Sequence, residues 1–253
     1  MKIKGCKLCG FPIEYRPNLY SDNGVCGACL NINIKKNIDF KSRQKWLTNY
    51  LTQAPKGKYE CVVGVSGGKD SHMIVKRLIE NHGVKNLLLI TTYDECTRTK
   101  AGQHNLDNIC KYFNVDHITY RYKPKKNIKE MLECFKKYLN PYMLAELRLG
   151  SFNSKVVEIA NAFNVVNIFY GEDAAFEYGS TRELNIFHNE SNDNTKFIFM
   201  GAIYPYGYID SLNEAKKVGF KDLDDFGEWN RQGAIENFAQ IDSITWFNIG
   251  VNL

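Results

Sequence analysis

Residues 62–71 combine side chains and backbone features that could bind phosphate groups. Residues 62–65 are apolar and mostly β-branched, which predicts a buried strand. A Ser-Gly-Gly segment at 66–68 interrupts this strand, and a helical pattern follows from Asp70. The first N–H groups of a helix are unpaired and lie at the positive end of its dipole, so a tight turn before a helix attracts anions. A glycine turn without a ligand is the alternative.

The residue types of this turn suit a ligand that carries phosphate groups. Lys69 supplies a mobile cation, and the two glycines let the backbone approach a ligand closely. The segment Ser-Gly-Gly-Lys-Asp-Ser differs from a Walker A motif. It resembles the pyrophosphate-binding loop of the PP-loop ATPases, which split ATP into AMP and pyrophosphate to activate an oxygen of a second substrate. The resemblance implies that the phosphates are bound by Ser66, Gly67, Gly68, Lys69, Asp70 and Ser71.

Four cysteines near the start of the chain have the spacing of a metal site. Two Cys-x2-Cys pairs are separated by sixteen residues, which suits a tetrahedral ion with four thiolate ligands. Two disulfides or an iron–sulfur cluster are the alternatives. Because the protein supplies all four ligands, we expect a structural Zn²⁺ bound by Cys6, Cys9, Cys26 and Cys29.

Length and composition bound the class of protein. A chain of 253 residues that is 44% hydrophobic can form one large domain with a small module. The net charge of +5 is compatible with nucleotide substrates and does not demand nucleic acid. We find no apolar run long enough for a membrane span and no signal-peptide core, so we expect a cytoplasmic protein. The expected parts are a zinc-ribbon module (1–40), a connecting helix (41–58) and a PP-loop ATPase domain (59–253).

Strands and helices alternate along the rest of the chain. Apolar strands are expected at 87–92, 117–120 and 165–170, with a short edge strand at 197–200. This alternation predicts an α/β fold with a parallel sheet, and the loop resemblance implies the nucleotide α-hydrolase-like version of it. In such sheets, ligands bind at the carboxyl ends of the strands.

Several side-chain environments follow from this pattern. Thr92 and Tyr93 end the second strand, where PP-loop enzymes contact adenosine; ordinary strand capping is the alternative. The apolar stripe at 128–139 is expected to pack into the core, and a further helix is expected to begin after Gly150 and Ser151.

A glycine and two carboxylates follow the strand at 165–170. Carboxylates at this end of a strand, beside an ATP loop, suit Mg²⁺ binding or general base catalysis, although they could instead cap a helix. The candidates are Gly171, Glu172 and Asp173.

Longer segments narrow the resemblance to one family. Residues 169–173 and 177–179 resemble the N-acetyl sugar amidotransferases, which are PP-loop enzymes of bacterial surface-polysaccharide and nonulosonate pathways. Further similarity occurs at 215–222, 228–231 and 235–243. It implies that ATP·Mg²⁺ adenylates the N-acetyl oxygen of a nucleotide-activated sugar, and that ammonia then displaces AMP to leave an acetamidino group. The implied catalytic residues are Lys69, Asp70, Glu172 and Asp173.

The resemblance also suggests a partner and leaves other functions open. Ammonia is expected from a separate glutamine amidotransferase similar to the glutaminase and cyclase subunits of histidine biosynthesis. A tRNA-thiolating PP-loop enzyme is the main alternative, and it would need a reactive thiol such as Cys96. A catalytically silent ATP-binding protein is the third hypothesis. The remaining cysteines, Cys61, Cys110 and Cys134, are expected to be core residues.

Overall fold

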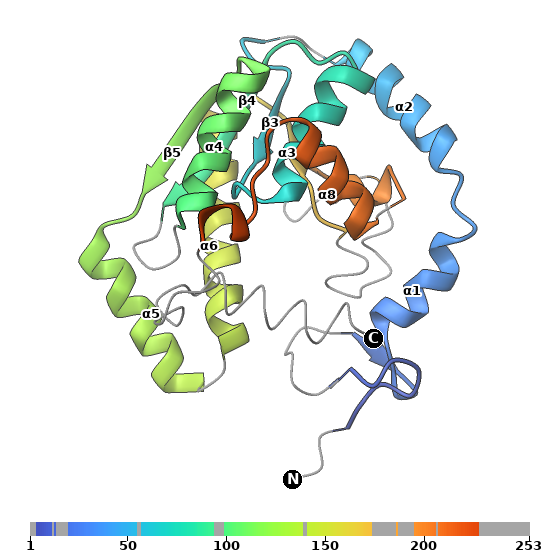
Figure 1. Cartoon of the computed structure of the whole chain (residues 1–253), viewed down its shortest axis with the longest axis vertical. Helices are drawn as coiled ribbons and strands as arrows, with labels where there is room; N and C mark the ends of the chain where they lie inside the picture. The colour runs from blue at the N-terminus through green and yellow to red at the C-terminus, as the bar shows by residue number, and fades with distance from the viewer. Residues whose placement is uncertain are drawn as a thin grey trace.

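A computed structural model of the chain describes residues 4–11, 13, 20–54, 57–93, 99–138, 141–173, 186, 195–205 and 207–227. Its centre is a parallel sheet of five strands in the order β5-β4-β3-β6-β7 (Figure 1). The strands are β3 (Cys61–Gly64), β4 (Leu87–Tyr93), β5 (Asp116–Arg121), β6 (Asn167–Tyr170) and β7 (Lys196–Phe199). The predicted α/β fold with a parallel sheet is therefore confirmed, including a short strand at its edge.

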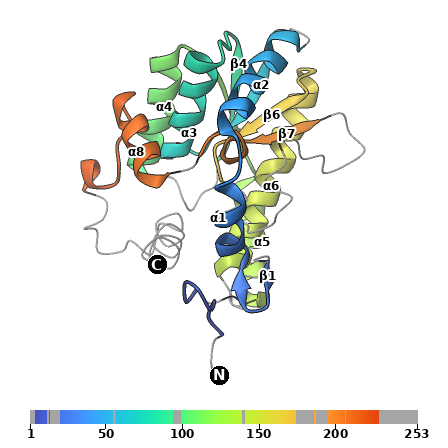
Figure 2. The same ribbon diagram turned by 90° about the vertical axis from the view of Figure 1, so that its right-hand side faces the viewer.

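Helices cover both faces of this sheet because each strand alternates its side chains. Val63 and Leu89 face a core shared with one group of helices, whereas Val62 and Leu88 face a second core. Figure 2 shows α3, α4 and α8 together on one side of the molecule and α5 and α6 on the other. The helices are α2 (Phe40–Gln53), α3 (Lys69–Lys76), the π-helix η1 (Arg77–Asn81), α4 (Lys100–Phe113), α5 (Pro124–Tyr138), α6 (Pro141–Ala162), α8 (Tyr208–Lys217) and the 3₁₀ turns η3 (Met200–Ala202) and η4 (Asp224–Phe226).

A short hairpin and one helix precede α2. Strands β1 (Ser21–Asp22) and β2 (Val25–Cys26) pair antiparallel around Asn23 and Gly24, whose φ angles are +48° and +77°. Two positive φ angles are what a tight two-residue hairpin requires, and Asn-Gly supplies them at little cost. Helix α1 (Gly27–Lys35) begins directly after β2, so Cys26 serves as its N-cap residue.

Two expectations about α5 and α6 are wrong. Helix α6 does not begin after Gly150; it starts at Pro141 and runs through that glycine, whose cost within a helix is only about 1 kcal/mol. The stripe on α5 is largely outside the core, because α5 packs against α6 in a layer beyond the sheet. Met131 is buried, but Ile128, Leu132 and Phe135 remain 40%, 52% and 42% exposed. Leu139 lies outside the described residues.

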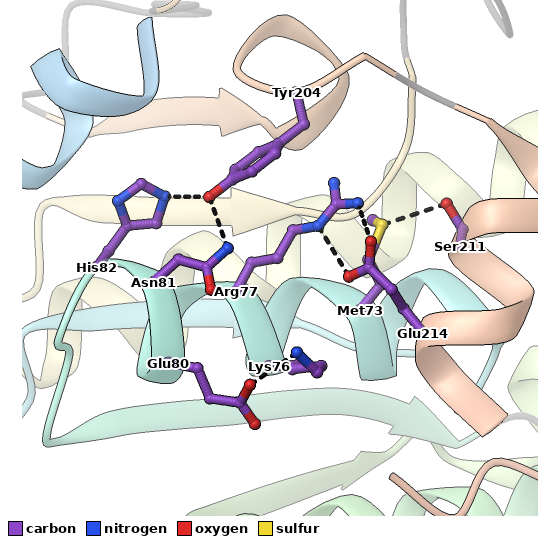
Figure 3. A network of polar contacts seen from close by, with 9 residues as sticks. All are labelled: Met73, Lys76, Arg77, Glu80, Asn81, His82, Tyr204, Ser211 and Glu214. Carbon is purple, nitrogen blue, oxygen red and sulfur yellow. Dashed lines mark hydrogen bonds and ion pairs between the residues drawn. The ribbon is translucent and has the colours of Figure 1, made fainter. Parts of the chain in front are cut away.

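A buried polar network holds α8 and η1 together (Figure 3). Arg77 donates to both carboxylate oxygens of Glu214 at 3.2 and 2.7 Å, and its guanidinium lies 4.3 Å from the ring centre of Tyr204. The Tyr204 hydroxyl lies 2.8 Å from His82 Nε2 and accepts a hydrogen bond from Asn81. Ile203 and Tyr204 are thus packed in the core. Within the described ranges, none of the helices has the length and hydropathy of a membrane span.

This network predicts a pH-dependent stability. Burial and the nearby Arg77 charge lower the pKa of His82 from 6.5 to about 4. Between these pH values the unfolded chain binds a proton that the folded protein does not, so the free energy of unfolding falls as pH drops, by up to roughly 3 kcal/mol. Urea unfolding at pH 7.5 and pH 5 should show this loss, and His82→Asn should reduce it without abolishing it, because a second buried histidine, His72, has a pKa lowered to the same value. An equal pH dependence in the variant would exclude His82 as its source.

Candidate nucleotide site and cysteine centre

The loop after β3 lies where the strand order reverses. From β3 the chain continues to β4 and β5 on one side, and later returns to place β6 on the other side. Parallel α/β sheets bind ligands at such switch points, beyond the carboxyl ends of the strands. The loop at 65–68 therefore lies between the end of β4 and the segment that follows β6. Strand order alone makes this the candidate site.

The turn itself is tight and held by specific contacts. Val65 N–H donates to the Ile90 carbonyl at 2.9 Å, and Ser66 N–H donates to Ser71 Oγ at 3.1 Å. Gly67 has φ = +88°, and a Cβ there would lie 2.7 Å from the Gly102 carbonyl oxygen. Only glycine combines this backbone conformation with this close approach. The predicted order of strand, turn and helix is observed, with α3 starting at Lys69.

Acidic and basic groups gather at the start of α3. Lys69 Nζ lies 2.7 Å from Asp70 Oδ2. Glu172, which follows β6, has its Oε2 buried with no hydrogen-bond partner among the described residues. Burial raises the pKa of Glu172 from 4.5 to about 7; its own backbone N–H opposes this shift, the Asp70 carboxylate adds to it, and Lys69 also opposes it. A buried carboxylate oxygen without a donor, beside a second carboxylate, fits a divalent cation such as Mg²⁺.

The glycine between β6 and these carboxylates brings the two segments together. A Cβ at Gly171 would lie 2.7 Å from the Asp70 carbonyl oxygen, so a larger side chain would push the segment away from α3. The structure therefore brings Gly171 and Glu172 to the turn, close to Asp70. The Asp173 carboxylate is instead paired with Lys35 of α1. Sequence reasoning missed Lys35, because nothing in its local pattern distinguishes it from the neighbouring lysines.

The other nucleotide candidates lie at the end of β4. Thr92 and Tyr93 are half-buried and pair with Tyr120 and Arg121 of β5. The Arg121 guanidinium lies 4.7 Å from the ring centre of Tyr93. Both candidates are thus at the carboxyl edge of the strand next to the loop, where an adenosine contact was expected. Cys96 and residues 177–179 lie outside the described residues.

His72 is a second residue that sequence reasoning missed. Its Nδ1 lies 3.1 Å from the Gly68 carbonyl and its Nε2 lies 3.2 Å from Asn108 Nδ2. Burial lowers the pKa of His72 to about 4, so the imidazole is neutral and donates through Nδ1 to the loop carbonyl. The sequence shows a histidine near the start of the helix that follows the turn, but its burial is a property of the tertiary structure.

The four predicted metal ligands form one cluster. All four sulfur atoms lie within 4.8 Å of one another, with 4.0 Å between Cys6 and Cys29 and 3.7 Å between Cys9 and Cys26. Four thiolates around one tetrahedral ion at 2.3 Å would be about 3.8 Å apart. All four residues are free thiols rather than disulfides. The donor set therefore fits a single tetrahedral ion.

The thiols differ in how readily they ionise. Burial opposes ionisation of Cys6, but backbone N–H groups of Cys26, Cys9 and Leu8 point at its sulfur and lower its pKa to about 6. Burial raises the pKa of Cys26 to about 11, and it also raises that of Cys29. Without an ion, the neighbouring sulfurs of Cys9 and Cys26 add to the rise of the Cys29 pKa. A bound cation would reverse this rise, because a coordinating thiol is deprotonated.

The other cysteines that the structure describes are not part of this cluster. Cys61 is fully buried in β3, as expected of a core residue. Cys110 and Cys134 are only partly buried. Cys134 therefore offers a matched control for substitutions in the cluster.

We predict one metal ion per chain, held by these sulfurs. Elemental analysis of the purified protein should give a stoichiometry near one, and Cys9→Ser should lower it because three thiolates bind less tightly. Cys134→Ser should leave the metal content unchanged. Retention of the full metal content by Cys9→Ser would contradict the four-thiolate site.

The comparisons with known proteins give distant similarities. No family model matches the sequence. One curated relative, an uncharacterised protein of Methanocaldococcus jannaschii, is 30% identical over 114 residues, which covers 44% of this chain and 40% of the relative. The match thus spans about two fifths of that relative's length.

Solved structures with a similar course of chain include three enzymes. NMN synthetase from Francisella tularensis has a TM-score of 0.47 and 14% identity, covering 85% of this chain and 96% of its own. The U34-tRNA thiolase NcsA from Methanococcus maripaludis, solved with its [4Fe-4S] cluster, has a TM-score of 0.48 and 18% identity, covering 95% and 86%. The NH3-dependent NAD synthetase from Campylobacter jejuni has a TM-score of 0.46 and 15% identity, covering 72% and 75%.

These three enzymes are members of the PP-loop ATPase superfamily, the group that the loop sequence resembles.

Proposed function

We propose that this protein is an ATP-dependent enzyme that cleaves ATP into AMP and pyrophosphate. One observation carries the proposal: the Ser-Gly-Gly-Lys-Asp-Ser turn lies at the switch point of the sheet and faces the buried carboxylate of Glu172. A phosphate site beside carboxylates that fit a cation suits nucleotide triphosphate chemistry, in which a metal offsets the negative charge.

Under this proposal, different residues of the site bind the phosphates, the metal and the adenosine. Backbone N–H groups at the start of α3 and the hydroxyls of Ser66 and Ser71 bind the phosphates, and Lys69 adds a positive charge. Asp70 and Glu172 would hold Mg²⁺, which supplies Lewis acidity toward the pyrophosphate leaving group. Thr92 and Tyr93 contact the adenosine. Asp173 orients this segment through its ion pair with Lys35 rather than by direct contact with the metal.

We further propose that the acceptor is the N-acetyl group of a nucleotide-activated sugar. The amide oxygen attacks the α-phosphorus of ATP, and the bond to pyrophosphate breaks. Ammonia then adds to the activated carbon, the bond from carbon to the AMP oxygen breaks, and one ammonia proton passes to solvent. The net change replaces oxygen by NH and leaves an acetamidino group. The family resemblance of residues 169–173 supports this assignment.

A separate glutamine amidotransferase is the proposed source of ammonia. Such a partner would deliver ammonia at the carboxyl edge of the sheet, where the loop and Glu172 lie. The ion of the cysteine centre is proposed to be structural Zn²⁺, since four protein thiolates fill a tetrahedral shell and leave no open position for a substrate.

A second candidate, tRNA thiolation, is favoured by one observation. Helix α5 lies beyond the carboxyl end of β5 (Figure 1) and presents exposed lysines, among them Lys125, Lys126 and Lys129. A basic surface on the same side as the nucleotide site suits a nucleic acid phosphate backbone. This hypothesis requires an essential thiol outside the cysteine centre, such as Cys96.

The first test is the release of AMP and pyrophosphate from ATP·Mg²⁺ with ammonium present. Release should depend on an N-acetylated nucleotide sugar, and the product should be lighter than the substrate by about one mass unit, as follows from replacing O by NH. Release that depends on bulk tRNA would establish the second candidate. Nucleotide binding without release under any of these conditions would contradict both enzymes and support a silent ATP-binding protein.

A second prediction concerns the pH dependence of ATP·Mg²⁺ binding. Because the pKa of Glu172 is about 7 and a metal ligand must be deprotonated, the affinity should rise as pH increases from 6 to 8. Glu172→Gln should weaken binding by roughly tenfold or more, the equivalent of about 1.4 kcal/mol, and should flatten the profile. Calorimetric titration of both proteins measures this. Glu130→Gln, on the exposed side of α5, is the matched control. A variant that keeps the wild-type profile would remove Glu172 from the metal site.

A further inference from the structure

We propose that Lys35 is a positioning residue of the nucleotide site and that α1 couples the metal state of the cysteine centre to ATP binding. The inference rests on the proposed function, because it assigns a new role within that site. Its chain of contacts runs from the cysteine cluster, along α1, to the carboxylates that follow β6.

The first link is the start of α1. Cys26 is the residue that precedes the helix, and Cys29 lies within its first turn, so two of the four ligands set where and how α1 begins. The helix has nine residues, or about 13 Å at the usual rise per residue. An isolated helix of this length is not stable in water, so it depends on its contacts at both ends.

The second link is the end of α1. Lys35, its last residue, forms an ion pair with Asp173 in which the two side chains are only 13% and 4% exposed. Solvent screens such a pair poorly, so its attraction is stronger than that of a surface pair. Removal of Lys35 would take this positive charge away from a buried carboxylate, which weakens the contact that holds the segment against α1.

The third link is the segment that carries the site. Gly171 lies against the backbone of Asp70, and the Glu172 carbonyl accepts a hydrogen bond from Gly201 N–H at 3.2 Å. Asp173 then meets Lys35. These three contacts fix residues 171–173 from three directions, and they determine where the Glu172 carboxylate lies. Of the three, only the contact with Lys35 comes from the part of the chain that contains the cysteines.

Loss of the metal should therefore change the geometry of the nucleotide site. Without the ion, the four thiols no longer hold the hairpin and the start of α1 in one geometry, so Lys35 is no longer held against Asp173. The Glu172 carboxylate is then less well placed for ATP·Mg²⁺. The presence or absence of the metal would thus change the affinity for ATP·Mg²⁺ through the position of α1.

Substitution of Lys35 tests the positioning role. Lys35→Met should raise the dissociation constant for ATP·Mg²⁺ by roughly 10–100-fold, the range seen when partners that orient metal ligands are removed. Lys35→Arg should restore much of the affinity, since it keeps the charge. Lys36→Met is the matched control, because Lys36 is exposed and contacts only its own helix through Asn33 in the described structure. Equal effects of Lys35→Met and Lys36→Met would overturn the role of Lys35.

A double-mutant cycle with Asp173→Asn tests whether the two residues act together. If Lys35 acts through Asp173, the double variant should bind ATP·Mg²⁺ about as weakly as the single variants rather than showing the product of their effects. Multiplicative effects would overturn this part of the proposal.

A metal-removal experiment tests the coupling. The wild-type protein is compared with Zn²⁺ bound, after chelation, and after Zn²⁺ is restored. Chelation should weaken ATP·Mg²⁺ binding in the wild type and have little further effect in Lys35→Met. Cys9→Ser should behave like the chelated wild type. An equal loss of affinity on chelation in both proteins would show that the metal acts by a route other than Lys35.

Hydrogen exchange tests the coupling independently of the proposed function, because it needs no ATP binding. Because Gly201 N–H donates to the Glu172 carbonyl, exchange in peptides covering 196–205 should speed up on chelation and in Lys35→Met, with no nucleotide present. If the wild type binds no ATP, the proposed function fails while this measurement still decides the coupling. Unchanged exchange in both cases would overturn the coupling.

Discussion

The parallel pairing of β6 beside β3 is the constraint on which the site depends. Val62 and Val63 pair with Ile168 and Phe169, and this register places Gly171 directly against the first turn of α3. Because the backbone after β6 and the backbone of Asp70 approach each other so closely there, the residue after β6 has to be glycine. The Ser-Gly-Gly turn after β3 and the carboxylate of Glu172 then share one edge of the sheet. A different strand order would separate them by the width of a strand or more.

Buried charges are the second feature of this structure, and two of them have an identified partner of opposite charge. Arg77 is paired through both donors with Glu214 and stacks on Tyr204, which keeps α8 against η1. Asp173 is paired with Lys35. Glu172 differs from both, because its Oε2 is buried without a hydrogen-bond partner in the described part of the chain. Unpaired buried carboxylates are costly, so a cation or a proton is the physical way to hold this one.

The cysteine centre stabilises a region that has little core of its own. Its strands are two residues long, and a two-stranded hairpin of this size is not independently stable. An ion held by four thiolates would replace hydrophobic burial as the source of local stability. The same ion would orient α1, whose last residue, Lys35, pairs with Asp173. Under our proposal, one short helix then links the stability of the small region to the geometry of the larger one.

Sequence patterns predicted the parts of the protein that local spacing controls. The strand, turn and helix at 61–76, the four-cysteine cluster and the parallel sheet could all be predicted, because period, glycine position and ligand spacing are local properties. The sequence also identified Gly171 and Glu172 as candidate site residues, and their roles are still predictions. Tertiary structure decided the rest. Lys35 and Asp173 are 138 residues apart in the chain, so no local pattern could pair them.

The exposure of α5 has the same origin. Its apolar stripe is correct for a helix, but burial depends on what the helix packs against, and α5 packs against α6 beyond the carboxyl end of β5 rather than against the sheet (Figure 1). The neutral state of His72 and the raised pKa of Glu172 likewise depend on how neighbours from distant segments exclude water. The sequence alone determined which local structures form and which chemical groups they carry. Only the tertiary structure decided which of those groups are desolvated and which charges meet, because desolvation and ion pairing depend on contacts between distant segments.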